Sequence, residues 1–341
     1  MLETIWFALW GLLWAVYFML DGFDLGMGAL HPFLARTEVE KRMLLNAAGP
    51  FWDGNEVWLI TAGGVTFAAF PRVYAVMFSA LYAPLLIILF ALIFRAVSME
   101  FRSKKDDPAW RALWDKGLFL GSAIPAVLFG VAFANLFMGI PIDGDGVYHG
   151  SLIALLSPYG LAGGVFFLVM FCMHGSLWAA IKTGGDLHDR ALGTARKLWP
   201  VLAVLTVLFL LLSAVYTDLF ANYLANPLLC LIPAIAVVAL AGIRVALTGG
   251  SPLRAWVCSA LFIVAVTFFG VAGMFPGMLI SSLDPAFTLT AFNAAASTLT
   301  LTIMLVVVCI SIPIVIAYQA WVYWLFKHKI TEVELETDHA Y

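Results

Sequence analysis

The stretch PFWDGNEVWLITAGG, residues 50–64, places three polar side chains at the start of an apolar segment. Asp53, Asn55 and Glu56 lie within about one helical turn of each other. An ionisable side chain inside a membrane segment costs about 3 kcal/mol even on a lenient insertion scale. Two such residues so close together require a partner, a water-filled path or a chemical role. The stretch therefore predicts a polar site within a membrane protein.

A second acidic turn, MLDGFDLGMG, lies near the end of the preceding apolar segment and contains Asp21 and Asp24. Side chains three residues apart share a helix face, so we expect Asp21 to lie beside Asp24 and Asp53 beside Glu56. Burial and a like-charged neighbour both favour the protonated form of one carboxyl in such a pair. Each pair could therefore hold a proton and pass it on.

A structural role is the alternative for the same acids. In that case Asp53 caps the helix that begins beside it. Asp21 and Asp24 would then bond to Asn55, to Arg36 or to nearby backbone.

The composition indicates the class of protein. The chain has 341 residues, of which 63% are hydrophobic and 11% are charged, whereas soluble domains average about 25% charged residues. An apolar run of about 20 residues can span a bilayer as a helix. We predict an all-α, polytopic transmembrane helical bundle of about nine spans, at residues 4–30, 51–70, 74–97, 118–140, 152–181, 198–220, 227–247, 255–280 and 295–326. Without the acidic segment 51–70 the count would be eight.

The basic residues predict the orientation. Of the 18 Lys and Arg residues, all but Arg72 fall in loops or span ends on one side of a nine-span chain. The positive-inside rule then places the N-terminus outside and the C-terminus in the cytoplasm. We expect one transmembrane domain over residues 1–326 and a polar cytoplasmic tail over residues 327–341. The loops are short, so no soluble catalytic domain is expected.

Histidine and cysteine argue against a cofactor held by this chain alone. Of six histidines only His174 lies well inside a predicted span, and the four cysteines form no Cys-x-x-Cys pair. A haem with two histidine ligands needs a second histidine facing the first, although a methionine ligand stays open. We expect no metal site, and we expect His174 to hydrogen-bond between helices.

The first span also carries a stripe of large aromatic side chains. Trp6, Trp10 and Trp14 recur every four residues and so share a helix face. This face could contact lipid, a partner subunit or a bound isoprenoid, and lipid is the default expectation.

The motifs DGFDLGMG and PFWDGNEVWLITAGG are followed by FPRVYAVMFSALY, FRAVSMEFRSK and WDKGLFLGS, and later by AYQAWVYWLF. In order and spacing they resemble subunit II of the cytochrome bd quinol oxidases. The resemblance covers essentially the whole chain. It implies a protein of the bacterial cytoplasmic (inner) membrane, in a respiratory complex that oxidises quinol and reduces oxygen to water.

The resemblance also implies where the chemistry takes place. Two haems b and one haem d belong to the partner, subunit I, so this chain has no catalytic residue and serves as scaffold. Small single-helix accessory subunits, and a structural quinone or phospholipid within this chain, occur in some relatives and stay open here. We expect membrane lipid, and no nucleic acid, around the chain.

The family's functional positions carry over onto particular residues. Asp53 matches an acid of the cytoplasmic proton channel at the subunit interface, and Trp58 matches a position near the oxygen entry of some relatives. Asp21 and Asp24 match the acids of the first span. Glu56 stands where some relatives have Gln, so its proposed part in the proton pathway is less firmly supported.

Two other functions fit parts of the sequence. A stand-alone proton-coupled transporter would place its acids near the membrane midplane, in broken helices of two corresponding halves. Here the acids gather near one end and the halves do not match. A purely structural membrane subunit would pair its acids internally.

Overall fold

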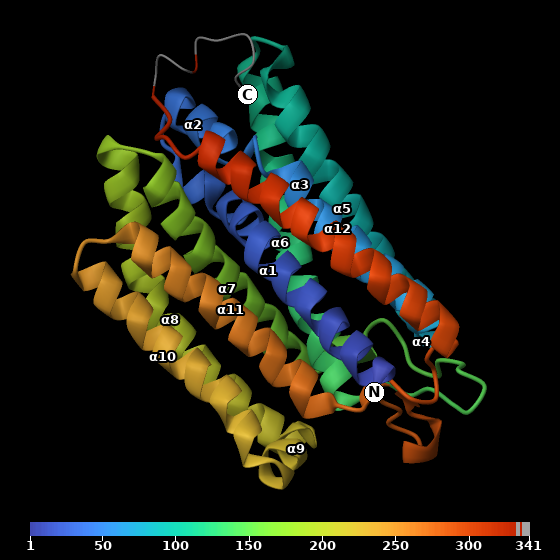
Figure 1. Ribbon diagram of the computed structural model, residues 1–341. Coiled ribbons are helices and arrows are strands. Elements are labelled where there is room, and N and C mark those ends of the chain that lie inside the picture. Colours follow the sequence, from blue (N-terminus) through green and yellow to red (C-terminus); the bar gives the residue numbers. More distant parts are fainter. Residues whose placement is uncertain (332–334, 336–341) are drawn as a thin grey trace.

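The computed structural model describes residues 1–331 and 335, which form an elongated bundle of long helices (Figure 1). The helices in chain order are α1 Leu2–Leu34, α2 Glu38–Ala48, α3 Trp52–Ala69, α4 Pro71–Ala80, α5 Tyr82–Phe101, α6 Pro108–Met138, α7 Pro158–Lys182, α8 Gly185–Tyr216, α9 Leu219–Ala225, α10 Leu231–Thr248, α11 Pro252–Met274 and α12 Thr298–Leu325. Short 3₁₀ turns occur at Arg102–Lys104, Ala154–Leu156, Pro227–Cys230 and Pro285–Phe287. Strands β1 Gly277–Leu279 and β2 Leu289–Thr290 pair antiparallel in one loop.

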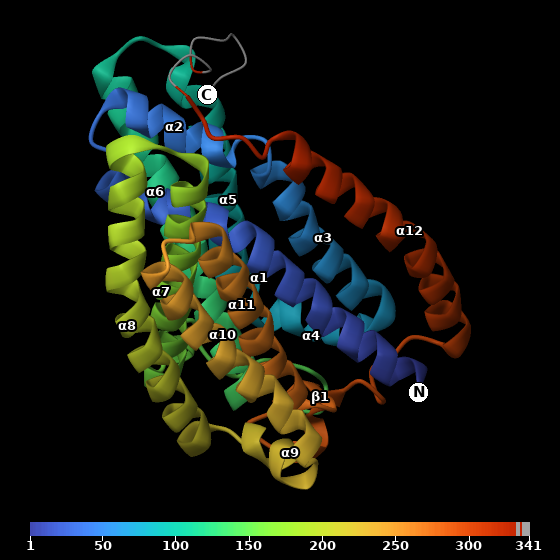
Figure 2. The same ribbon diagram turned by 60° about the vertical axis from the view of Figure 1, so that its left-hand side comes forward.

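The all-α membrane fold predicted from the composition is confirmed. Eight described helices are long and apolar enough to cross a membrane, namely α1, α5 to α8, α11, α12 and α10 with the turn before it. The acidic helix α3 is not among them. It nevertheless runs between the two ends of the bundle, beside α12 (Figure 2). Ala296 N donates to Ala69 O at one end of this pair, and Trp58 Nε1 donates to Gln319 Oε1 nearer the other.

The crossings alternate in direction along the chain, so α1 begins at one end of the bundle and α12 ends at the other (Figures 1 and 2). This arrangement is the one that nine spans would give. The nine-span count, the orientation and the single domain over residues 1–326 stay predictions. Of the predicted tail, residues 332–334 and 336–341 lie outside the described residues.

Several helix bounds differ from the predicted spans. The predicted third span is divided at Leu81 into α4 and α5. Helix α6 begins ten residues before the apolar run, at Pro108, where the Asp107 side chain accepts from Ala109 N. Helix α8 likewise begins at Gly185. Apolar content marks only the part of a helix that lies in hydrocarbon, so charged extensions of a helix are missed.

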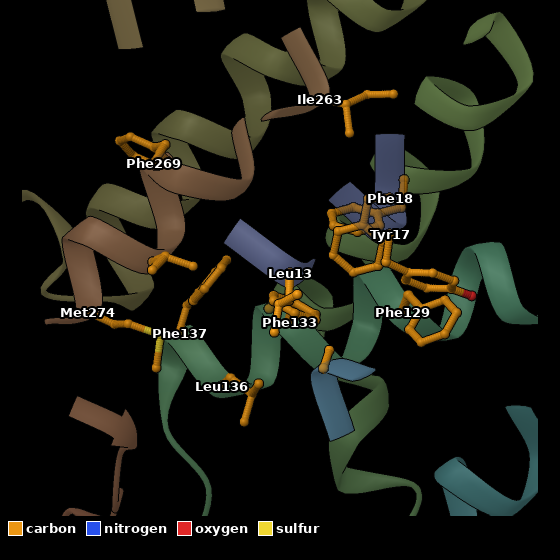
Figure 3. Packing of buried hydrophobic residues seen from close by; sticks show 14 of the residues in the cluster. Leu13, Tyr17, Phe18, Phe129, Phe133, Leu136, Phe137, Ile263, Phe269 and Met274 are labelled. Atoms are coloured by element: carbon orange, nitrogen blue, oxygen red, sulfur yellow. The ribbon is translucent and has the colours of Figure 1, made fainter. Parts of the chain in front are cut away.

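Aromatic rings fill the centre of the bundle. Phe18 lies 5.0 Å from Phe133 and 5.1 Å from Phe167 between ring centroids, with edge-to-face geometry (Figure 3). Such pairs contribute about 0.5–1.5 kcal/mol beyond their buried area. Because these rings come from α1, α6 and α7, they hold together the three helices at the centre of the fold.

Glycine allows α1 and α7 to approach closely. A Cβ atom added at Gly26 would overlap the backbone carbonyl of Phe171, and one at Gly22 would lie 2.8 Å from the Phe171 ring. Small residues four apart are typical of such helix contacts in membranes. This contact keeps the acidic turn of α1 inside the protein.

The expectation that the tryptophan stripe faces lipid is wrong. Trp6 and Trp10 are fully buried. Trp6 Nε1 donates to Leu301 O, and Trp10 Nε1 donates to Thr66 Oγ1, each at 3.0 Å. A buried indole N–H needs an acceptor, and α3 and α12 supply it. Trp6 and Trp10 therefore join α1 to the peripheral pair α3 and α12.

The membrane topology can be tested with reporters. A cytoplasm-active reporter fused after Tyr341 should be active, and the same reporter inserted between Asp143 and Gly146 should be inactive, because an odd number of crossings separates the two points. Activity at both positions, or at neither, would contradict the nine-span topology.

A second prediction concerns the contact of α1 with α7. Gly26→Ala should lower the melting temperature of the assembled complex, since overpacking costs about 1–3 kcal/mol. Gly193→Ala in α8 is the matched control, because a Cβ atom there would meet nothing within 4 Å. Equal melting temperatures for the two variants would show that the contact is not tight.

Candidate functional site

A buried cluster of charged residues joins α1, α3 and α5. Arg95 Nη2 lies 2.7 Å from Asp21 Oδ1 and 2.5 Å from Glu56 Oε1. The side chains of Arg95 and Asp21 are 1% and 0% exposed, and that of Glu56 is 22% exposed. We call these three residues, with Asp24 and Asn55, the buried acid cluster.

Asp24 has a different partner from Asp21. Asn55 Nδ2 donates to Asp24 Oδ2 at 2.8 Å, and Tyr323 OH donates to Asn55 Oδ1 at 3.2 Å. Asn55 thereby links α1 to α3 and, through Tyr323, to α12. The predicted bond between the acids of α1 and Asn55 is confirmed for Asp24.

Arg36 was one of the alternative partners stated for the acids of α1. That alternative is wrong for Asp21, because the charge beside Asp21 comes from Arg95. A Cβ atom added at Gly121 of α6 would lie 2.6 Å from Arg95 N, so α6 packs directly against this turn of α5. By its position in the sequence, Arg95 counts as a charge at the end of a predicted span. Apolar neighbours on both sides, in LIFRAV, were the available signal that this arginine needs a buried acid.

The two acids of α3 are close enough to interact electrostatically, but their other surroundings differ. Glu56 points to Arg95, whereas Asp53 is exposed. Of the described residues, none forms a hydrogen bond or ion pair with Asp53, and α3 begins at Trp52 without a side-chain cap. The structure thus offers no support for a capping role of Asp53.

The charges of the cluster do not balance if every group is ionised. Arg95 supplies one positive charge against the carboxylates of Asp21, Asp24 and Glu56. Uncompensated charge in a low-dielectric interior costs several kcal/mol. Charge balance therefore favours at least one proton held among these carboxyl groups.

A second ionic group lies beside α2, at the end of the bundle where α1 ends (Figure 1). Asp115 lies 2.6 Å from Arg102 Nε and 2.9 Å from Lys41 Nζ, and Glu38 lies 2.7 Å from Arg102 Nη2. Partial burial acts to raise the pKa of Glu38, but hydrogen bonds from Lys41 and Arg102 lower it below its usual range. We call Glu38, Lys41, Arg102 and Asp115 the α2 network.

Trp58 lies on α3, about one helical turn beyond Asn55. It is 6% exposed and lines an apolar cavity of about 480 Å³ between α1, α3, α11 and α12, together with Trp6 and Trp256. A second apolar cavity, of about 570 Å³, lies between α3 and α5 beside Trp14. Both are large enough for an apolar ligand.

His174, the histidine that the sequence places deepest in a predicted span, hydrogen-bonds to neighbouring helices. His174 Nδ1 lies 3.0 Å from Ser259 Oγ, and Nε2 lies 3.0 Å from Met19 O. Its ring also stacks on Trp256 at 5.1 Å between centroids. Both ring nitrogens are thus engaged, and the predicted hydrogen bonds between helices are confirmed.

Comparisons with known proteins cover nearly the full length of the chain. The family model described as cytochrome bd terminal oxidase subunit II matches residues 2–326. Cytochrome bd ubiquinol oxidase subunit 2 of Bacillus subtilis (strain 168) is 38% identical over 335 residues, with 98% of each chain covered. Cytochrome bd-I ubiquinol oxidase subunit 2 of Escherichia coli (strain K12) is 35% identical over 372 aligned positions, covering 98% of this chain and 97% of that protein.

A solved structure shares the fold. A chain of bd oxidase from Geobacillus thermodenitrificans superposes with a TM-score of 0.75, covering 95% of this chain and 98% of that chain at 14% identity. The eight apolar helices and the bacterial relatives place the protein in the bacterial inner membrane as a multi-pass protein. From the family match and the identity to these relatives, the chain belongs to the cytochrome bd terminal oxidase subunit II family, whose members are subunits of respiratory quinol oxidases.

Proposed function

We propose that this chain is the haem-free subunit of a cytochrome bd quinol oxidase, in which it supports a haem-bearing subunit I and carries part of the cytoplasmic proton inlet. The observation that carries the proposal is the buried acid cluster. It places more carboxyl groups around Arg95 than one guanidinium can balance. A group that holds a proton without a fixed counter-charge can accept it from one side and release it to another.

Asp53 and the buried acid cluster would form successive parts of this inlet. Asp53 lies exposed at the start of α3, three residues before Glu56, which contacts Arg95. An exposed carboxyl group at this end of the bundle is suited to collect protons at an interface with subunit I. The cluster would then hold them inside the membrane.

The inlet would account for energy conservation without a pump. Reduction of one oxygen molecule to two waters consumes four protons. Each elementary charge that crosses 100 mV corresponds to about 2.3 kcal/mol. If quinol releases its protons outside and water formation takes protons only from the cytoplasm, each turnover charges the membrane.

The cavity beside Trp58 supports a second role. Oxygen is apolar and partitions into apolar cavities, and this cavity is also large enough for a quinone or phospholipid tail. We propose that it serves as an oxygen path or as the site of a structural lipid in the complex. We propose that the haems are held by subunit I, and the engagement of both ring nitrogens of His174 supports this assignment.

The proton-inlet role predicts the effect of Asp53→Asn. Asparagine keeps the size and polarity of the side chain but cannot titrate, so quinol-dependent oxygen consumption per haem d should fall by about tenfold or more. Haem content should stay normal, because Asp53 forms no hydrogen bond or ion pair with another described residue that the substitution would remove. Glu56→Gln should reduce turnover less, since Gln keeps an acceptor for Arg95.

Asp106→Asn provides the matched control for Asp53→Asn. Asp106 is an exposed acid at the same end of the bundle, in an ion pair with Arg111, and pairs of this kind contribute little. Normal turnover of Asp53→Asn, with full haem, would remove Asp53 from the proton path.

A further prediction concerns His174. In the assembled complex, His174→Gln should leave the absorbance of haems b and d per complex unchanged, because His174 binds Ser259 and Met19 rather than a metal. The melting temperature should fall, since a buried hydrogen bond is lost. Loss of a haem band in the folded complex would assign a haem ligand to this chain.

A further inference from the structure

A small cavity separates the buried acid cluster from the α2 network. It has a volume of about 20 Å³ and is lined by polar groups of Asp24, His31 and Arg95 together with apolar side chains that include Ala48 and Met99. A cavity of about 10–15 Å³ already holds one water molecule if polar partners surround it. The space therefore accommodates a single water.

Three residues that line this cavity carry unsatisfied polar atoms. Asp24 Oδ1, both ring nitrogens of His31, and Arg95 Nε and Nη1 are buried without a hydrogen-bond partner among the described protein groups. Asp24 is 4% exposed, and His31 and Arg95 are each 1% exposed. Leaving such a group unpaired costs about 1–3 kcal/mol, so these atoms together point to water in the cavity.

His31 connects the cavity to the α2 network. His31 Nε2 lies 3.9 Å from Asp115 Oδ1, within ion-pair range but too far for a direct hydrogen bond. The charged groups that face His31 are Asp115, Arg102, Lys41 and Glu38. The Glu38 side chain is 48% exposed, so this network reaches the surface of the bundle.

We propose that the α2 network, His31 and a water in this cavity form a second proton inlet, which enters the buried acid cluster at Asp24. This inference rests on the proposed function of the cluster and adds a route that does not pass through Asp53. The two routes approach the cluster from different elements. Asp53 leads along α3 to Glu56, whereas His31 leads along α1 to Asp24.

The imidazole of His31 can pass a proton without a net change in its own charge. A proton arriving from the side of Asp115 binds one ring nitrogen, and the proton on the other nitrogen leaves for the cavity water. The water passes a proton to Asp24 Oδ1, and the ring is left as its other tautomer. Rotation of the ring then restores the first tautomer, so that the next proton can follow.

The test measures quinol-dependent oxygen consumption per haem d in membranes that contain the assembled complex. In the Asp53→Asn background the remaining turnover should depend on the second inlet. His31→Leu in that background should therefore lower turnover by about a further tenfold, as for the loss of a positioned proton-transfer group. His31→Leu alone should lower it by at most about half, because the inlet through Asp53 remains.

A second pair of variants leaves His31 in place. Ala48→Val adds methyl groups to the wall of the cavity and should exclude the water, so in the Asp53→Asn background it should reproduce the loss seen with His31→Leu. Ala35→Val is the matched control. Ala35 and Ala48 are equally buried, each 7% exposed, but Ala35 does not line the cavity.

The outcomes separate this inference from the proposed function. If Asp53→Asn/Ala48→Val and Asp53→Asn/Ala35→Val both turn over as fast as Asp53→Asn, the second inlet is overturned while the role of Asp53 stands. If Asp53→Asn alone has normal turnover, the role of Asp53 fails. In that case the His31 inlet is supported only if Ala48→Val by itself slows turnover and Ala35→Val does not.

Discussion

The structure depends on the buried guanidinium of Arg95 and the acids that surround it. Arg95 lies in an apolar helix with its side chain 1% exposed, and the cost of burying that charge can be offset only by close carboxylates. Asp21 of α1 and Glu56 of α3 provide them at 2.7 and 2.5 Å. Helix α3 is too polar to be counted among the apolar membrane-spanning helices. The ion pair of Glu56 with Arg95 and the hydrogen bond of the Asn55 amide to Asp24 explain how α3 is held inside the protein.

Close helix packing makes this arrangement possible. Gly26 lets α1 approach α7, and Gly121 lets α6 approach the backbone of Arg95. Interhelical contacts in membranes rely on such close approach, because apolar side chains gain little by leaving lipid for protein. A small cavity remains beside Asp24 and His31. Tight contacts and a small enclosed space thus occur together around the acids, and both bear on how protons could move.

Much of the site could be predicted from residue types alone. Acids inside apolar segments predicted a polar site at Asp21, Asp24 and Glu56, and the bond of Asp24 to Asn55 was among the stated alternatives. Arg95 and His31 were missed, because one was counted as a flanking charge and the other lies near a helix end. Asp53 and Glu56 interact electrostatically at the start of α3, but a spacing of three residues says nothing about which other neighbours cover each side chain. The prediction that Trp6 and Trp10 face lipid was wrong for a related reason. A stripe of residues shows that they share a helix face, but it does not show what that face contacts.

The sequence by itself determined the membrane class, the order of the apolar helices and the family, because hydropathy and motif spacing are local properties of the chain. Only the tertiary structure decided which charges meet. The ion pair of Arg95 with Asp21 joins residues 74 positions apart, and Tyr323 reaches Asn55 across 268 positions. Such pairings depend on which helix faces approach each other, and that is fixed by packing among all the helices rather than by the pattern within one.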